Sequence, residues 1–326
     1  MKPIVVVGAG HNGLAAALRL AEAGRKVIVC EARSSAGGLA ARRSIAEGYN
    51  VPGIWHDTTL VRPALLSSLG LEKHGLKWRP RADLFARVDG DEPICFRYKD
   101  GTVDGVDESN RKAFVAWQSF IKRLASVLGG LMDAPPPNPS GELMPLLWAG
   151  LKIRRLGQKD MTELLRLAPM CVADWLRDLF SDEALSAALS LDGVEAMPYG
   201  PWSAGTAPLL LLREALAGQE VVGGPAALID AMLAAAAERK VEVRCDCPIT
   251  KVSIKDSAVV AVETAAGVIE TDTVVASCNP KQLFRVLIGE ERLPVDLASD
   301  IHIIMYCLLG AFFSIVGFLF ASFNEL

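Results

Sequence analysis

The residues of this sequence best suited to chemistry form a glycine-rich turn near the N-terminus, followed by one carboxylate. Gly8 permits a tight turn, Gly10 leaves neighbouring amide N–H groups open to an anion, and Gly13 lets a helix pack closely on a sheet. Glu31 comes 18 residues after Gly13, where a carboxylate can accept hydrogen bonds from both hydroxyls of an adenosine ribose. Because its negative charge would repel a 2′-phosphate, the pattern predicts a dinucleotide with a free ribose.

Three segments must position these residues. An apolar, β-branched run at residues 3–7 precedes the turn, an alanine-rich segment at 14–23 follows it, and a second β-branched run at 26–30 ends beside Glu31. This order predicts a strand, a phosphate-binding turn, a helix and a second strand, which form one βαβ unit. A glycine turn alone is a weak signal, since glycines also mark ordinary turns. The alternative, a glycine-rich turn in an unrelated α/β unit, is disfavoured because all these features occur together.

A second glycine pair, Gly37 and Gly38, continues the motif after Glu31. The stretch from the first turn to this pair resembles the extended fingerprint of the two-dinucleotide-binding-domain flavoproteins, the glutathione-reductase-like superfamily that binds FAD. Within that superfamily it is similar to the phytoene desaturase and amine oxidase branch, which residues 51–57 and 69–76 also match. The alternative interpretation of the glycine pair is another loop turn.

The resemblance implies FAD as the cofactor and an α/β fold. It predicts an FAD-binding, Rossmann-like βαβ domain of the glutathione-reductase type, with a mainly helical cap or substrate insert and a β-meander. The expected boundaries are 1–77 plus 221–298 for a discontinuous FAD-binding domain, 78–220 for an incomplete cap domain and 299–326 for an apolar tail. The residues expected to bind the cofactor are Gly8, Ala9, Gly10, Gly13, Glu31, Arg33, Gly37, Gly38 and Ile249.

The later part of the chain carries patterns that would complete this fold. Helical spacing of apolar residues predicts helices at 109–128, 161–179 and 226–239. Short β-branched runs predict strands, of which three form a meander and the last returns to the main sheet. These strands are expected at 241–244, 249–254, 259–264, 268–271 and 273–277. By resemblance, the backbone at Ile249 would contact the adenine.

Seven cysteines are scattered through the chain without a CxxC pair. This spacing argues against a disulfide framework, a zinc site or a dithiol relay, and no metal is expected. Cys30 is predicted to be a buried structural thiol, and the Cys245–Cys247 pair to be incidental. Residues 223–225 contain two glycines and a proline, so they do not form a second dinucleotide turn.

No catalytic side chain can be identified from the sequence. Trp55, His56 and Trp202 are candidates for the flavin side of the site, although His56 also fits an ordinary loop histidine. The resemblance implies hydride transfer from an apolar or amine-type small-molecule substrate to the flavin. The alternatives are an NAD-dependent dehydrogenase, a catalytically incomplete flavoprotein fragment that acts through interaction, and a flavin isomerase.

Composition and the termini give expectations about partners and location. A net charge of −4 without a basic run argues against nucleic-acid binding. The N-terminus carries no signal peptide, so a cytoplasmic or organelle-matrix protein is expected. Ile301–Phe323 has no Asp, Glu, Lys or Arg, and such a segment could be a membrane anchor, a buried helix or an aberrant end of a truncated chain. The sequence gives no oligomeric state.

Overall fold

The predicted βαβ unit forms at the N-terminus. In the computed structural model, β1 (Ile4–Val7), α1 (His11–Glu22) and β2 (Val27–Cys30) follow one another, and β1 pairs with β2 in parallel. Every residue of both strands is buried, which explains their continuous β-branched sequence. The structure describes residues 1–51, 54–86, 93–132, 150–151, 154–195, 199–295, 297–298 and 301.

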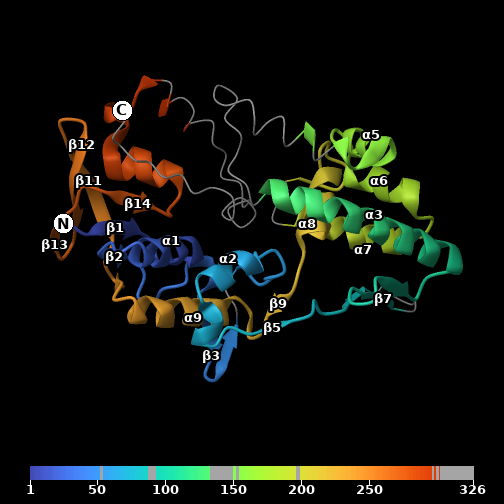
Figure 1. The fold of residues 1–326 in the computed structure, drawn as a ribbon, viewed down its shortest axis with the longest axis horizontal. Coiled ribbons are helices and arrows are strands. Elements are labelled where there is room, and N and C mark those ends of the chain that lie inside the picture. Colours follow the sequence, from blue (N-terminus) through green and yellow to red (C-terminus); the bar gives the residue numbers. More distant parts are fainter. Residues whose placement is uncertain are drawn as a thin grey trace.

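Strands from late in the chain complete the parallel sheet. β10 (Glu242–Arg244) pairs with β2, and β14 (Val274–Ala276) pairs with β1, which gives the order β10-β2-β1-β14. Helix α9 (Gly224–Glu238) packs against α1, and the two helices share a core with Leu14 and Met232. Figure 1 shows these blue and orange elements side by side. The fold class predicted from the sequence is therefore confirmed.

The predicted β-meander also forms. It consists of β11 (Ile249–Lys255), β12 (Ala258–Thr264) and β13 (Gly267–Glu270), which pair in antiparallel order. A π-helical segment, η3 (Gln282–Gly289), packs against β11, and Val252, Val262 and Leu287 belong to one buried cluster. The meander lies at the end of the parallel sheet in Figure 1.

The middle of the chain forms a second, mainly helical part. Its core is aromatic: Trp117 and Trp175 meet edge to face with ring centroids 6.1 Å apart, and Phe96, Phe114 and Phe180 belong to the same cluster. The elements of this part are α3 (Glu108–Met132), α5 (Gly157–Leu167), α6 (Val172–Leu179), α7 (Glu183–Val194), α8 (Ala207–Leu216) and a small antiparallel sheet of β6 (Leu84–Ala86), β7 (Ile94–Arg97) and β8 (Thr102–Asp104).

The single helix predicted at 161–179 is wrong, because the chain breaks between α5 and α6. Pro169 lies in the break; it has no N–H to donate and disfavours helical geometry in the residue before it. A residue distant in sequence accepts from the first amide of the new helix: the Val172 N–H donates to the Thr206 hydroxyl over 2.9 Å. The apolar residues of both helices still face the same core.

A narrow ribbon connects the two parts. β5 (Trp78–Arg79) and β9 (Glu220–Val221) pair in antiparallel fashion and run between the parts in Figure 1. The predicted domain boundaries stay predictions. The remaining elements are η1 (Gly38–Ala40), β3 (Arg43–Ala46), β4 (Tyr49–Val51), α2 (Pro63–Ser68), η2 (Leu71–His74) and η4 (Glu290–Arg292).

The apolar tail predicted at 299–326 lies almost entirely outside the described residues. Within the described part of the chain, no helix combines the length and the hydropathy needed to cross a membrane.

The aromatic core predicts a clear mutational contrast. Trp175 is 1% exposed, so Trp175→Ala should lower the free energy of unfolding by about 3–5 kcal/mol through lost burial and a residual cavity. Leu165 is 68% exposed on the neighbouring helix, so Leu165→Ala should change it by less than about 0.5 kcal/mol. Urea denaturation measures both, and equal effects would contradict this description of the core.

Candidate functional site

The two glycine motifs meet at the carboxyl end of β1. The Gly37 N–H donates to the Ala9 carbonyl over 2.9 Å, and Gly10 and Gly37 form an isolated parallel bridge. Gly8 has φ +97° and Gly37 φ +122°, both in the region that favours glycine. Motifs about 30 residues apart in sequence thus build one surface, as the fingerprint requires.

Gly13 and Gly10 are glycines for different reasons. A Cβ on Gly13 would lie 2.0 Å from the Gly8 carbonyl oxygen, so the turn itself excludes a side chain there. The prediction attributed Gly13 to helix–sheet packing, and the structure shows that the closest obstacle is the turn. A Cβ on Gly10 would meet only the Gly38 Cα, at 3.9 Å. The protein therefore tolerates a methyl group at Gly10, and space beside the turn remains for a ligand.

The N-terminus of α1 faces this surface with its donors uncapped. Gly10 is the N-cap residue and, among the described residues, no side chain caps the helix. The first amide groups of any helix lack partners within the helix, and the helix dipole places partial positive charge at this end. These donors suit the phosphates of a dinucleotide.

Glu31 is fixed in place by backbone amides. It is 8% exposed; its Oε2 accepts from the Ala9 N–H at 2.8 Å and its Oε1 from the Arg33 N–H at 3.0 Å. An ionised carboxylate offers about four lone-pair positions, so each oxygen keeps capacity for a further donor. Glu31 is therefore oriented at the edge of the turn and remains able to accept from a ribose diol.

The late segment predicted to approach the adenine lies beside Glu31. The Cys247 N–H donates to the Glu31 carbonyl at 2.8 Å, and the Asp246 N–H donates to the Arg33 carbonyl at 2.9 Å. Ile249 begins β11 two residues later. Arg33 also donates from Nη1 to the Gly38 carbonyl at 3.2 Å. The structure thus places Arg33 and the segment leading to Ile249 beside Glu31, and the contact of the predicted residues with a nucleotide stays a prediction.

Cys30 and Cys247 lie together, a proximity that the sequence analysis missed. Both thiols are free and buried, and the two side chains belong to one buried cluster. Burial raises the pKa of Cys30 to about 12, and the neighbouring Cys247 adds to this shift. A thiol that stays protonated is a poor nucleophile. Cys247 is therefore a packing partner of Cys30, and the predicted structural role of Cys30 fits this burial.

A small apolar cavity of about 40 Å³ lies next to the turn. His11 and Trp55 line it with ring centroids 4.6 Å apart, and Leu65, Leu228 and Met232 complete its apolar wall. Burial lowers the pKa of His11 to about 4, so its ring is neutral near pH 7. The sequence analysis placed His11 inside the glycine turn and did not single it out; in the structure it is the first residue of α1.

The three predicted flavin-side residues lie in different environments. Trp55 lies beside the turn, as described above. His56 contacts Glu195 of the helical part, with its Nε2 3.2 Å from Oε1. Trp202 is exposed, and the Arg177 guanidinium lies over its ring at 4.4 Å. Of these three residues, Trp55 is the one whose contacts place it next to the glycine turn.

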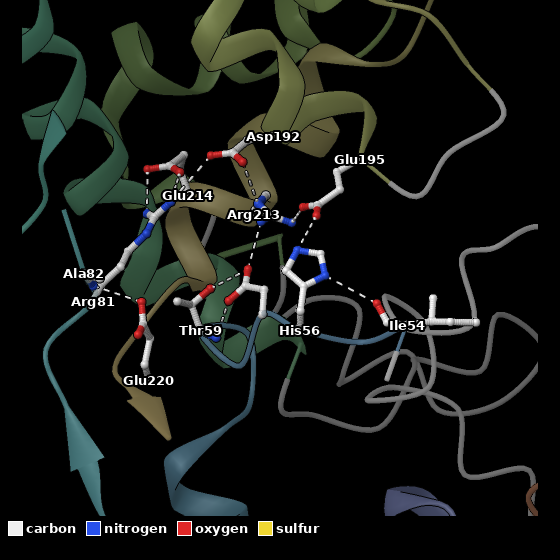
Figure 2. Close-up of polar contacts among 11 residues, drawn as sticks. Ile54, His56, Thr59, Arg81, Ala82, Asp192, Glu195, Arg213, Glu214 and Glu220 are labelled. Carbon is white, nitrogen blue, oxygen red and sulfur yellow. Dashed lines mark hydrogen bonds and ion pairs between the residues drawn. The ribbon is translucent and has the colours of Figure 1, made fainter. Parts of the chain in front are cut away.

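A network of half-buried charges joins the two parts of the protein, and Figure 2 shows its members converging on Arg213 of α8. Arg213 lies 2.8 Å from Asp57 Oδ2, 2.6 Å from Glu195 Oε2 and 3.3 Å from Asp192 Oδ1. Asp57 in turn accepts from the N–H and hydroxyl of Thr59. Arg213 thus holds the segment around Asp57, which leads out of the βαβ part, against helices α7 and α8.

A second arginine strengthens the same joint. Arg81, just after β5, pairs with both oxygens of Glu214 at 3.0 and 3.2 Å and stacks over the Tyr98 ring at 3.4 Å. Burial raises the pKa of Asp192 to about 6, although Arg213 acts in the opposite direction.

Sequence reasoning missed this network because its members are far apart in sequence. An arginine directly after four leucines at 209–212 was the only local signal.

The turn geometry predicts a specific cost for a methyl group at Gly13. Gly13→Ala should lower the free energy of unfolding by about 1–3 kcal/mol, since its Cβ would overlap the Gly8 carbonyl oxygen. Gly200→Ala is the matched control, because its Cβ would meet no described atom within 4 Å. Denaturant titration compares the two variants. If Gly13→Ala is as stable as the control, the described turn is wrong.

The half-buried Asp192 predicts a pH-dependent stability difference. Its pKa is raised from 3.8 to about 6 in the folded state, so the folded protein binds this proton more tightly than the unfolded chain does. Ionised Asp192 therefore costs stability as pH rises from about 4 to about 7, and Asp192→Asn removes that cost. Relative to the wild type, the unfolding free energy of the variant should rise across this window. A difference that does not change with pH would contradict the assignment.

Comparison with known proteins places these features in context. Residues 6–60 match the NAD(P)-binding Rossmann-like domain family. The chain is 29% identical to pyridine nucleotide-disulfide oxidoreductase domain-containing protein 2 of Mus musculus in an alignment 325 positions long, which covers 89% of this chain and 55% of that protein. The Rattus norvegicus protein of the same name is 28% identical over the same shares. The chain thus spans about half the length of the curated relatives it matches.

Solved structures share the fold at low sequence identity. Putrescine oxidase bound to putrescine is 19% identical with a TM-score of 0.59, over 92% of this chain and 63% of that chain. Cyclohexylamine oxidase from Brevibacterium oxydans is 18% identical with a TM-score of 0.53, over the same shares. These comparisons confirm the predicted resemblance: the chain is similar to the pyridine nucleotide-disulfide oxidoreductase domain-containing 2 proteins and has the fold of amine oxidase structures.

Proposed function

We propose that this chain binds FAD and belongs to an FAD-dependent oxidoreductase of the dehydrogenase, desaturase or oxidase type. One observation carries the proposal: the glycine pair Gly37–Gly38 packs directly on the Gly8–Gly13 turn, and Glu31 is held between them by backbone amides. The uncapped helix start would bind the pyrophosphate and Glu31 the adenosine ribose.

The residues present fit this cofactor. Gly10 and Gly38 approach each other without side chains, which leaves a cradle that a larger residue would fill. The Asp246–Ile249 segment runs beside Glu31 and would cover the adenine. When bound, the flavin would supply the hydride acceptor. The protein would bind and orient it, and the apolar wall around Trp55 would help to exclude water.

The substrate is proposed to be a small apolar or amine-type molecule. Support comes from the solved structures of similar fold, which include oxidases of putrescine and of cyclohexylamine. The helical part, tied to the βαβ part through Arg213 and Arg81, would form part of the substrate side of the site. No side-chain base is assigned, because hydride transfer to a flavin does not require one.

An NAD-dependent dehydrogenase is the second candidate. It is favoured by the match of residues 6–60 to the NAD(P)-binding Rossmann-like domain family. Glu31 would accept the ribose hydroxyls of NAD in the same way as those of FAD. The glycine pair on the turn favours FAD. Quenching or enhancement of NADH fluorescence on titration, without any binding of FAD, would decide for the second candidate.

A non-catalytic role is the third candidate, because the chain spans about half the length of its curated relatives. In that case FAD would bind, but no amine or apolar substrate would reduce it under anaerobic conditions. Bleaching of the bound flavin by any of these substrates would exclude this candidate.

The cofactor proposal predicts that Gly10→Ala separates folding from binding. The added methyl group meets only the Gly38 Cα, so the variant should fold, yet it should weaken FAD binding by about tenfold or more by obstructing the pyrophosphate. Gly200→Ala serves as the control. Flavin absorbance after reconstitution and gel filtration measures bound cofactor. A wild-type chain that stays colourless, or a Gly10→Ala variant that binds like the control, would contradict the proposal.

A further inference from the structure

Ser277 lies at the end of β14 and reaches across to the turn after β1. Its N–H donates to the Val7 carbonyl at 3.0 Å, and its hydroxyl oxygen lies 3.0 Å from the Val7 carbonyl and 3.2 Å from the Gly8 carbonyl. Ser277 is exposed, so its side chain is not needed to fill the core. The same hydroxyl occupies the space that side chains on Gly8 and Gly13 would need, at 2.8 and 2.7 Å from their virtual Cβ positions.

The peptide group between Gly8 and Ala9 is held at both ends. In a trans peptide the C=O and N–H groups point in opposite directions. Here the Gly8 carbonyl faces the Ser277 hydroxyl, and the Ala9 N–H donates to Glu31 Oε2 at 2.8 Å. Rotating this peptide would break both contacts together, so the position of the carbonyl determines the direction of the donor that orients Glu31.

We propose that Ser277 is a positioning residue for the dinucleotide: its hydroxyl fixes the Gly8–Ala9 peptide and thereby holds the Glu31 carboxylate ready for the ribose diol. The inference rests on the proposed function, in which Glu31 binds the adenosine ribose. It also assigns a role in cofactor recognition to the end of β14, a strand about 270 residues away in sequence.

The geometry separates this role from simple space filling. A filler would need only the volume of the side chain, which an alanine methyl group partly supplies. The hydroxyl has one hydrogen and donates to one carbonyl at a time. The Val7 carbonyl already accepts from the Ser277 N–H, and the Gly8 carbonyl belongs to the peptide whose N–H contacts Glu31. Removing the hydroxyl should therefore affect ribose recognition more than it affects folding.

The test compares binding of ADP and 2′-deoxy-ADP by calorimetry. Because a hydrogen bond to a charged group is strong, the wild type should prefer ADP by about tenfold. Ser277→Ala should lower this preference to about threefold or less, and Ser277→Thr, which keeps the hydroxyl, should restore it. Ser253→Ala is the control, since the Ser253 hydroxyl bonds Glu263 in the meander.

Glu31→Gln completes the design. This variant should lose the preference for ADP, and adding Ser277→Ala to it should have no further effect on the preference, because both residues act through one contact. A merely structural serine would weaken both ligands equally and leave the ratio unchanged. That result would overturn the proposal. Loss of folding in both Ser277→Ala and Ser277→Cys, the second of which keeps the size of the side chain without the hydroxyl, would also overturn it. If the wild type binds neither ADP nor FAD, the proposed function itself fails.

Discussion

The site depends on one hydrogen bond, from the Ala9 N–H to the Glu31 carboxylate. This contact joins the turn after β1 to the end of β2. Hydrogen bonds to an ionised acceptor are stronger than those between neutral groups. Glu31 is nearly buried, so its charge needs such partners, and the amides of Ala9 and Arg33 supply them.

The second constraint is the charged joint between the two parts of the protein. Arg213 faces Asp57, Asp192 and Glu195, and removing it would leave these carboxylates without their shared cation in a poorly solvated place. Ion pairs removed from water add little net stability, but removing one partner is costly because it leaves the other charge unpaired. In this protein they link the segment that follows the glycine pair, and carries His56 and Thr59, to the helical part.

Much of the fold could be predicted because its signals are local. The β-branched runs, the glycine spacing and the acid after β2 all lie within 38 residues, and the late strands carry their own turn residues. The break at Pro169 was visible in the sequence, but the helical spacing of leucines across it dominated the interpretation. Within the helix, the missing N–H of proline overrides that spacing.

The remaining features needed three-dimensional pairing that no local pattern encodes. Cys247 meets Cys30 only because β10 pairs with β2, and Ser277 meets Gly8 only because β14 pairs with β1. The charged joint likewise assembles from residues between 56 and 214. Sequence reasoning therefore identified the turn and Glu31, and it missed the contacts that depend on the pairing of segments far apart in the chain.

Amide hydrogen exchange with and without FAD tests the central claim most directly. The described geometry predicts slower exchange in three segments at once, residues 8–14, 31–38 and 245–250, because one dinucleotide would contact the turn, the glycine pair with Glu31 and the approach to Ile249. Protection that omits the first two segments, or no protection at saturating FAD, would contradict the assignment of this edge as the cofactor site.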